Sequence, residues 1–165
     1  NYVVIGHSER RQYAKEDNQL INQKVKVSLK HNVTPILCVG ETLEQRESNQ
    51  TISVIKEQLK VGLNDIDSNS NIVIAYEPVW AIGTGKVATP NQAQEIHAYI
   101  REYLSTLSIE LAKRTRILYG GSVKPDNISE LITQNDIDGA LIGGASLKAS
   151  SFMSIASKCI TTKTQ

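Results

Sequence analysis

A regular alternation of short apolar runs with longer amphipathic segments constrains the fold of this chain more than any other feature of its sequence. The apolar runs have the length of buried strands, and we predict strands at 2–5, 34–39, 72–76, 116–119 and 139–142. The segments between them carry apolar residues at helical spacing, and we predict helices at about 18–30, 48–63, 91–113, from 126 or 127, and at 151–160. Strands that alternate with helices pair in parallel through right-handed crossovers, which predicts an α/β fold in a single domain, 1–165.

Polar or glycine-rich clusters follow every predicted strand. They are His7, Glu41, Glu77, Gly120 to Ser122, and Gly143 with Gly144. In a parallel sheet all carboxyl ends lie at the same edge, where ligands bind in both barrels and open α/β folds. We therefore expect these clusters to converge on one ligand site.

Composition narrows the kind of ligand. The formal net charge is +1 and aromatic residues make up 5% of the chain, so neither a basic stripe nor stacking aromatics indicate a nucleic-acid surface. No apolar run approaches the roughly 20 residues of a membrane span. Cys38 and Cys159 form no CxxC pair and no cluster with histidine at metal-ligand spacing, which indicates reduced thiols in a cytoplasmic protein without a metal site. We expect a small-molecule ligand.

The strand at 72–76 is followed by a loop that combines proline, apolar residues and glycine. Glu77 and Pro78 end the strand, because proline has no amide donor and disfavours a helical conformation at the preceding residue. The loop combines an apolar tip with glycines, which predicts a lid over the site. Its residues are Pro78, Val79, Trp80, Ala81, Ile82, Gly83, Thr84, Gly85 and Lys86. Residues 89–92 then have the pattern of a capped helix start.

Glu77 and His7 are the candidates for acid–base chemistry. A single glutamate at a strand end is more often a surface or ion-paired residue, and a single histidine is more often structural, which is our interpretation of His31 and His97. A lid that excludes water beside Glu77 would raise the pKa of its carboxyl group and make it a competent base near neutral pH. A neutral His7 at the same edge could donate a hydrogen bond to a carbonyl or enediolate oxygen. The two residues predict a base and electrophile pair.

Two glycine clusters follow consecutive strands and are candidates for binding phosphate. Glycine also serves tight turns, but two clusters in succession, joined by Ser122, present backbone amides as a phosphate cradle requires. In (β/α)8 barrels such a cradle lies after strands seven and eight. A Walker loop is excluded because Trp80 and Val87 occupy positions that need glycine and a hydroxyl residue, and no dinucleotide fingerprint is present.

Four motifs carry a resemblance to a known family. They are GHSERR at 6–11, AYEPVWAIGTGK at 75–86, YGGSV at 119–123 and GALIGGASL at 139–147. In this order, each at the end of a strand, they resemble the C-terminal five-eighths of the triosephosphate isomerases. The resemblance implies a partial (β/α)8 barrel of five consecutive βα units, strands 4 to 8. It also implies the interconversion of D-glyceraldehyde 3-phosphate and dihydroxyacetone phosphate, in glycolysis and gluconeogenesis.

The resemblance further implies roles for individual residues. Glu77 would move a proton between adjacent carbons of a triose phosphate and neutral His7 would polarise the carbonyl, in a family for which this pair is a standard example. Glu9 would support the site, and Tyr119 with Ser122 would hold the closed lid. The amides that would bind the phosphate belong to Gly83, Ser122, Gly143 and Gly144. The resemblance implies no cofactor and no metal ion.

Three strand–helix units of the family have no counterpart in this sequence. The chain starts at Asn1, directly before its first predicted strand, so we expect it to be cut from something longer. The missing units include an asparagine and a lysine that hold the substrate and a loop that reaches a partner subunit, so a homodimer is expected of the complete enzyme. Five parallel strands cannot close a barrel of eight, and the strands at 2–5 and 139–142 should have exposed edges.

Two interpretations of function remain open. In the first, these residues are the larger part of a triose-phosphate isomerase that is active when whole. In the second, they form a non-catalytic half-barrel that at most binds small phosphorylated ligands. Other phosphate-binding barrels, such as indole or ribulose-phosphate enzymes, do not combine GHSERR with the YEPVWAIGTGK loop.

Overall fold

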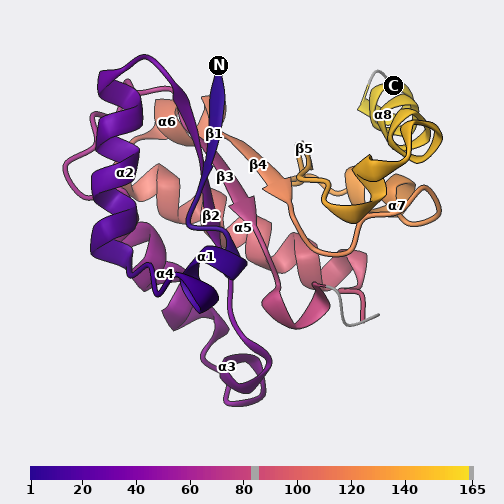
Figure 1. Cartoon of the computed structure of the whole chain (residues 1–165), viewed down its shortest axis with the longest axis horizontal. Coiled ribbons are helices and arrows are strands. Elements are labelled where there is room, and N and C mark those ends of the chain that lie inside the picture. The colour runs from indigo at the N-terminus through magenta and orange to yellow at the C-terminus, as the bar shows by residue number, and fades with distance from the viewer. Residues whose placement is uncertain (83–85, 164–165) are drawn as a thin grey trace.

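The computed structural model describes residues 1–82 and 86–163, within which five strands form one parallel sheet (Figure 1). The strands are β1 (Tyr2–Ile5), β2 (Thr34–Val39), β3 (Val73–Tyr76), β4 (Arg116–Tyr119) and β5 (Gly139–Ala140). Their order in the sheet is their order in the chain, and every neighbouring pair is parallel. The predicted α/β class and parallel pairing are confirmed, and the arrangement is consistent with part of a (β/α)8 barrel.

Helices follow the strands. The described helices are α1 (Ser8–Tyr13), α2 (Asn18–Lys30), α3 (Leu43–Glu47), α4 (Thr51–Gly62), α5 (Pro90–Leu107), α6 (Ile109–Arg114), α7 (Ile128–Ile132) and α8 (Ala149–Lys163), with 3-10 turns η1 (Val79–Ala81) and η2 (Gly144–Leu147). In Figure 1, α2 and α4 lie on the side of β1 and β2, whereas α7 and α8 lie beyond β5. None of the described helices has the length and hydropathy needed to cross a membrane.

The hydrophobic core lies between one face of the sheet and these helices. Neighbouring positions of four strands supply one row of the core: Ile5, Leu37, Ile74 and Ile117. Burying each such side chain contributes about 1.5–3 kcal/mol to folding. The adjacent positions point to the opposite face, where Cys38 and Ala75 are paired neighbours and are fully buried. Alternation along β3 places Glu77, two residues after Ala75, on that same face.

One predicted helix is divided, and another begins three residues later than predicted. The helix expected at 91–113 is divided into α5 and α6 at Ser108, which is extended (φ −165°, ψ 131°) and whose hydroxyl accepts a hydrogen bond from the Leu111 amide at 3.3 Å. The helix expected at 48–63 is preceded by the separate α3, and Asn49 between α3 and α4 has a left-handed conformation (φ 57°). Serine and asparagine favour these breaks because their side chains substitute for helical hydrogen bonds.

Two other differences concern short elements. The strand expected at 139–142 contains only two residues, because the chain turns away into η2 after the Leu141 amide has donated to the Tyr119 carbonyl at 2.9 Å. Helix α1 was not predicted, since its polar sequence SERRQY has no apolar periodicity. By contrast, α2 and β2 have the predicted bounds.

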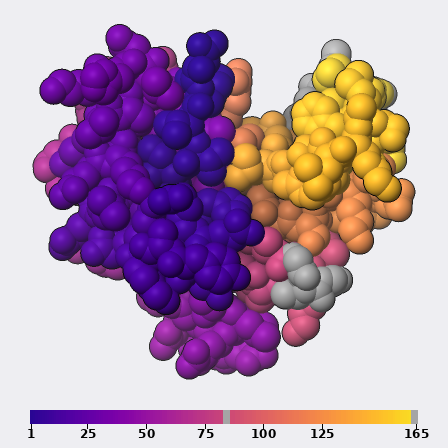
Figure 2. Space-filling view, in the orientation of Figure 1, coloured from indigo at the N-terminus to yellow at the C-terminus, as the bar shows by residue number. Residues whose placement is uncertain are grey.

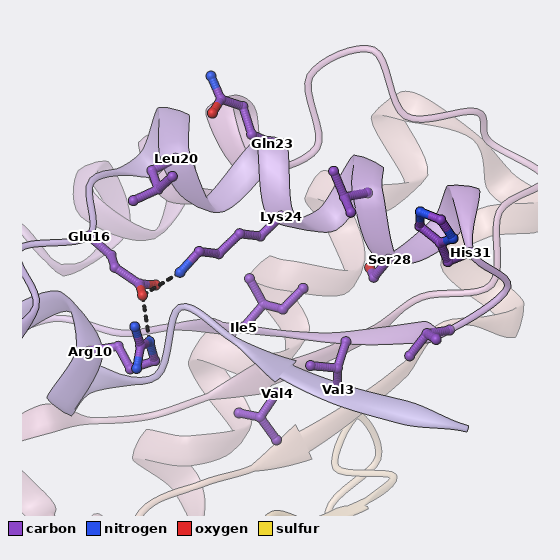
Figure 3. Close-up of a pocket in the computed structure, with 12 residues that line it drawn as sticks. Val3, Val4, Ile5, Arg10, Glu16, Leu20, Gln23, Lys24, Ser28 and His31 are labelled. Atoms are coloured by element: carbon purple, nitrogen blue, oxygen red, sulfur yellow. Dashed lines mark hydrogen bonds and ion pairs between the residues drawn. The ribbon is translucent and has the colours of Figure 1, made fainter.

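β1 and β5 form the two edges of the sheet, as expected. Tyr2 of β1 is 59% exposed, and a groove of about 610 Å³ lies between β1 and α2. Figure 3 shows apolar side chains such as Val3 and Leu20 lining this groove, with the Glu16 carboxylate between Arg10 and Lys24. On the other side, Figure 2 shows a notch between the N-terminal residues and α8.

Candidate active site at the carboxyl edge of the sheet

A cavity of about 590 Å³ opens at the carboxyl edge of the sheet. The clusters that follow β1, β3, β4 and β5 all contribute to its walls, with His7, Glu77, Ser122, Lys124, Gly143 and Gly144 among them. The fifth cluster, at Glu41 after β2, lies apart from the cavity and packs beneath η1. Four of the five clusters therefore meet at one cavity.

Glu77 is almost completely buried at the end of β3, with 2% of its surface exposed. Its Oε1 lies 2.9 Å from His7 Nε2, and its Oε2 accepts a hydrogen bond from the Ser8 amide at 3.0 Å. Burial raises the pKa of the Glu77 carboxyl group, while His7, the Ser8 amide, the Cys38 thiol and the Arg11 guanidinium each oppose that rise. A carboxylate destabilised by burial accepts a proton more readily than an exposed one.

His7 is held in one tautomer by the start of α1. Its Nδ1 accepts a hydrogen bond from the Glu9 amide at 3.3 Å, so Nδ1 carries no proton. The proton of the neutral imidazole is then on Nε2, which donates it to Glu77 Oε1. The structure therefore places the Nε2–H group of His7 directly against the buried carboxylate.

Two glycines allow the chain to pass close to Glu77. The Glu77 amide donates to the Val39 carbonyl at 2.7 Å, and a Cβ on Gly40 would lie 1.7 Å from the Glu77 carbonyl oxygen. A Cβ on Gly120 would lie 2.9 Å from Glu77 Cγ. No larger residue fits at either position without moving the glutamate.

The described part of the predicted lid is attached to the body of the protein through residues that include Glu41 and Ser122. Trp80 Nε1 donates to Glu41 Oε1 at 2.9 Å, and Ser122 Oγ donates to the Ala81 carbonyl at 2.7 Å. Glu41 is fully buried and also accepts hydrogen bonds from Tyr76 Oη at 3.1 Å and from Arg46 at 3.1 Å. Burial and the negative charge of Glu41 raise the pKa of Tyr76. These contacts fix η1.

The structure describes only some of the remaining lid residues and the helix start that follows them. Gly83, Thr84 and Gly85 lie outside the described residues. The predicted start of the following helix is confirmed, because Thr89 and Gln92 bond reciprocally as a capping box with Pro90 at the first turn. Tyr119 is buried, and burial raises its pKa to about 12 against the effect of the Ala88 amide near its hydroxyl group.

The two glycine clusters form the other end of the cavity. Ser122, Gly143 and Gly144 line it, and Lys124 is the one lysine or arginine among the described residues that do so. Asn127 stabilises the loop after β4, since its amide donates to the Ser122 carbonyl at 2.8 Å and its oxygen accepts from the Lys124 amide at 2.8 Å. Backbone amides and one cation suit a small anion.

The predicted residues Glu9, Tyr119 and Trp80 are not among those that line the cavity. The carboxylate of Glu9 is exposed, and only its backbone amide takes part, through His7. His97, interpreted as structural, is fully buried between Tyr76 and Tyr119, and burial lowers its pKa to about 4. In the part of the chain that the structure describes, no group of three or more histidine, cysteine or acidic side chains is placed to bind a metal ion.

Three residues near the site were not singled out from the sequence. The Cys38 thiol of β2 lies beside the Glu77 carboxylate, and burial raises the pKa of that thiol. Gln58 of α4 bonds both the amide and the carbonyl of Gly40, at 2.8 and 3.0 Å. Arg11 bonds carbonyls at the ends of two strands. Arg11 lies inside the GHSERR motif, which was a signal, but nothing in the sequence distinguishes Gln58.

Comparison with known proteins adds evidence of relationship. Residues 1–159 match the sequence model of the family described as triosephosphate isomerase. The triosephosphate isomerase of Endomicrobium trichonymphae is 56% identical over 154 residues, which cover 92% of this chain and 62% of that protein. That of Coxiella burnetii (strain Dugway 5J108-111) is 54% identical over 161 residues, or 96% of this chain and 63% of that protein. The chain thus spans somewhat less than two thirds of the length of these relatives.

Proposed function

The chain belongs to the triosephosphate isomerase family, and from this premise we propose that it carries the proton-transfer residues of a triose-phosphate isomerase. The reaction would interconvert D-glyceraldehyde 3-phosphate and dihydroxyacetone phosphate. The observation that carries the proposal is the contact of 2.9 Å between His7 Nε2 and the buried carboxylate of Glu77, at one end of a cavity whose other end is lined by Ser122, Gly143 and Gly144.

Glu77 would act as the base. A substrate that enters the cavity would take the place of the contact between Glu77 and His7, leaving Glu77 to face the two adjacent carbons and His7 to face their oxygens. Glu77 would remove the proton from the hydroxyl-bearing carbon, and the electron pair of that C–H bond would form the carbon–carbon double bond of an enediolate. Return of the proton to the neighbouring carbon would complete its transfer.

His7 would stabilise the oxygen that becomes negative. Its Nε2–H points into the cavity as a neutral donor and would bond the carbonyl oxygen as charge develops there. The two isomers also differ in which oxygen bears a proton, and Nε2 would carry a proton from one oxygen to the other. Both steps need the tautomer that the Glu9 amide selects.

The glycine loops would bind the phosphate group. Ser122, Gly143 and Gly144 line the far end of the cavity, and their amides would bind the phosphate together with that of Gly83 in the lid, which lies outside the described residues. Closure held by Tyr119 and Ser122 would exclude water, so the enediolate would be reprotonated before it could eliminate phosphate.

The proposal extends to the place of this chain in the complete enzyme. The five strands would be strands 4 to 8 of the barrel and the chain its C-terminal portion, a single domain over 1–165. The complete enzyme would be a cytoplasmic homodimer of glycolysis and gluconeogenesis, with no cofactor and no nucleic-acid or membrane partner. The match over 62–63% of the length of the relatives supports this assignment of a part to a whole.

A second candidate function is binding without turnover. The same partial length and the unpaired edges of β1 and β5 favour a half-barrel that at most binds small phosphorylated ligands. In that case the glycine end of the cavity would bind the phosphate group, and Glu77 and His7 would transfer no proton.

The test is the isomerase assay on two proteins: the 165-residue chain and the complete product of its gene. Glu77→Gln should lower kcat/KM by about 10³-fold, because a general base contributes about 10²–10⁴-fold. Glu95→Gln on α5, an exposed carboxylate, is the matched control and should leave activity unchanged. Activity in the complete protein alone would assign turnover to the whole barrel. Absence of activity in both, with phosphate bound, would overturn the proposal in favour of the binding function.

A further inference from the structure

Arg11 on α1 joins the carboxyl ends of two neighbouring strands. Its Nε donates to the Gly6 carbonyl at 2.8 Å, and one terminal nitrogen donates to the Cys38 carbonyl at 3.0 Å. The other terminal nitrogen donates to Asn18 Oδ1 at 2.6 Å, so all three nitrogens are engaged. We call the pair of contacts from Arg11 to the Gly6 and Cys38 carbonyls the Arg11 fork.

The strand end that the fork fixes is the one that aims His7. Gly6 has a left-handed conformation (φ 73°), which sets the direction in which the chain leaves β1 toward His7. The space around it is tight, since a Cβ on Gly6 would lie 3.2 Å from the Arg11 terminal nitrogen and 3.3 Å from the Cys38 carbonyl. Movement of Gly6 would therefore move the His7 ring relative to Glu77.

The other carbonyl belongs to the residue that faces Glu77. The Cys38 thiol lies beside the Glu77 carboxylate, so the fork fixes one residue on each side of that carboxylate. The guanidinium is itself close enough to attract both Glu77 and Cys38 electrostatically. Its planar shape, with several donors in fixed directions, is what two carbonyls on different strands require, and lysine cannot reproduce it.

We propose that Arg11 is a positioning residue of the proposed isomerase site, whose fork holds His7 and Glu77 in the geometry that proton transfer requires. This inference rests on the proposed function, because it gives Arg11 a role in that reaction. Arg11 touches neither substrate nor reacting atoms and acts through Gly6, Cys38 and the charge it places near Glu77.

The neighbouring arginine provides a matched control. Arg10 has a side chain that is 57% exposed and pairs with Glu16 in the groove beside β1 (Figure 3). It makes no hydrogen bond to a strand end among the described residues. Arg10→Met removes the same charge from the same helix and should leave the site unchanged.

The test compares Arg11→Lys, Arg11→Met and Arg10→Met in the complete gene product. Arg11→Lys keeps the charge and loses the fork, so kcat/KM should fall about tenfold with the low-pH limb of its profile unmoved. Arg11→Met loses both, so kcat/KM should fall about 100-fold, as expected for misplacement of a reacting group by about 1 Å. The low-pH limb should also move to higher pH, because loss of a nearby positive charge raises the pKa of Glu77.

A measurement that does not depend on turnover separates this inference from the proposed function. The ¹³C resonance of the Glu77 carboxyl group reports its titration, which His7, Cys38, Arg11 and, across the cavity, Lys124 all face. It should titrate at higher pH in Arg11→Met than in Arg11→Lys or Arg10→Met. If the parent protein has no activity but the resonance shifts in this way, the proposed function fails while the placement of Arg11 stands.

Two outcomes would overturn the role of Arg11. One is an Arg11→Lys protein with the kcat/KM of the parent, because the fork would then be dispensable. The other is an Arg11→Met protein with an unmoved pH profile and an unmoved Glu77 resonance. If Arg11→Met does not fold, Arg11→Lys decides alone, with a fall in kcat at unchanged melting temperature as the supporting result.

Discussion

The two ends of the candidate site are built differently. At the acid–base end the backbone is packed so closely that a Cβ on Gly40 would lie 1.7 Å from the Glu77 carbonyl oxygen. At the glycine end, the cluster after β4 is also tight, since a Cβ on Gly121 would lie 2.3 Å from Tyr119 Oη, but in the loop after β5 a Cβ on Gly143 or Gly144 would have no heavy atom within 4 Å. Glu77 and His7 are therefore held by closely packed backbone, whereas the loop after β5 borders open space. The geometry of the acid–base end is therefore set by the packing of the fold, whereas the loop after β5 has room to adjust to a ligand.

The largest expected effect is a loss of stability from a substitution at the closely packed acid–base end. Gly40→Ala should lower the free energy of unfolding by about 3 kcal/mol or more, because the new methyl group would overlap backbone that cannot yield. Gly144→Ala is the matched change and should cost about 0.5 kcal/mol or less. Urea unfolding of the two variants measures the difference. Equal losses would remove the distinction between the two ends.

A somewhat smaller effect is expected at the base of the lid. Glu41→Ala would remove the buried carboxylate that accepts hydrogen bonds from Tyr76 Oη, Trp80 Nε1 and Arg46, at a cost of about 2–3 kcal/mol. Trp80 is the single tryptophan of the sequence, so its fluorescence should move to longer wavelength as its environment becomes wetter. Glu44→Ala on α3 removes an exposed carboxylate and serves as control. Unchanged emission in Glu41→Ala would show that η1 is fixed by other contacts.

The pH dependence of stability sharpens the account of the acid–base end. The pKa of Glu77 is raised above its ordinary 4.5, so between those two values the native state binds more protons than the unfolded state. The contribution of Glu77 to stability is therefore lost as pH rises through its folded-state pKa. Glu77→Gln should melt at higher temperature than the parent at neutral pH, and the gain should vanish below the ordinary value. A gain that persists in acid would contradict this origin.

The smallest effect is expected at the open end. Lys124→Ala should weaken the binding of inorganic phosphate about two- to fivefold, because an exposed charge contributes about 0.2–1 kcal/mol. The difference should shrink when sodium chloride is raised to about 0.5 M, since added salt screens exposed charges. Isothermal titration gives the affinities, and Lys56→Ala on α4 controls for net charge. Identical affinities for both variants would mean that the amides alone bind the anion.

The sequence was informative wherever local pattern decides structure. The apolar run of β2 and the spacing of α2 predicted both elements with their observed bounds, and the pattern at 89–92 predicted the capped start of α5. Convergence of His7 and Glu77 followed from parallel strands, whose carboxyl ends must share an edge. These predictions depend on periodicity and on the alternation of strands and helices, both of which can be recognised directly in the sequence.

What the sequence could not show depends on contacts between distant residues. Ser108 divides a helix whose apolar spacing is continuous, because one hydroxyl satisfies the Leu111 amide. Gln58 lies on a helix 18 positions from Gly40, and its two bonds to that residue follow from how α4 packs on β2. The tautomer of His7 likewise depends on the backbone of α1, a helix without apolar periodicity.

The order of the sheet has a consequence for how the molecule forms. Each strand pairs with the next one along the chain, from β1 to β5. During synthesis every new strand would meet an edge that is already made, so the sheet can grow in the direction of translation without waiting for distant partners. The same order predicts how the sheet opens: amide hydrogens should exchange first at β1 and β5 and last at β3, which Glu77 directly follows.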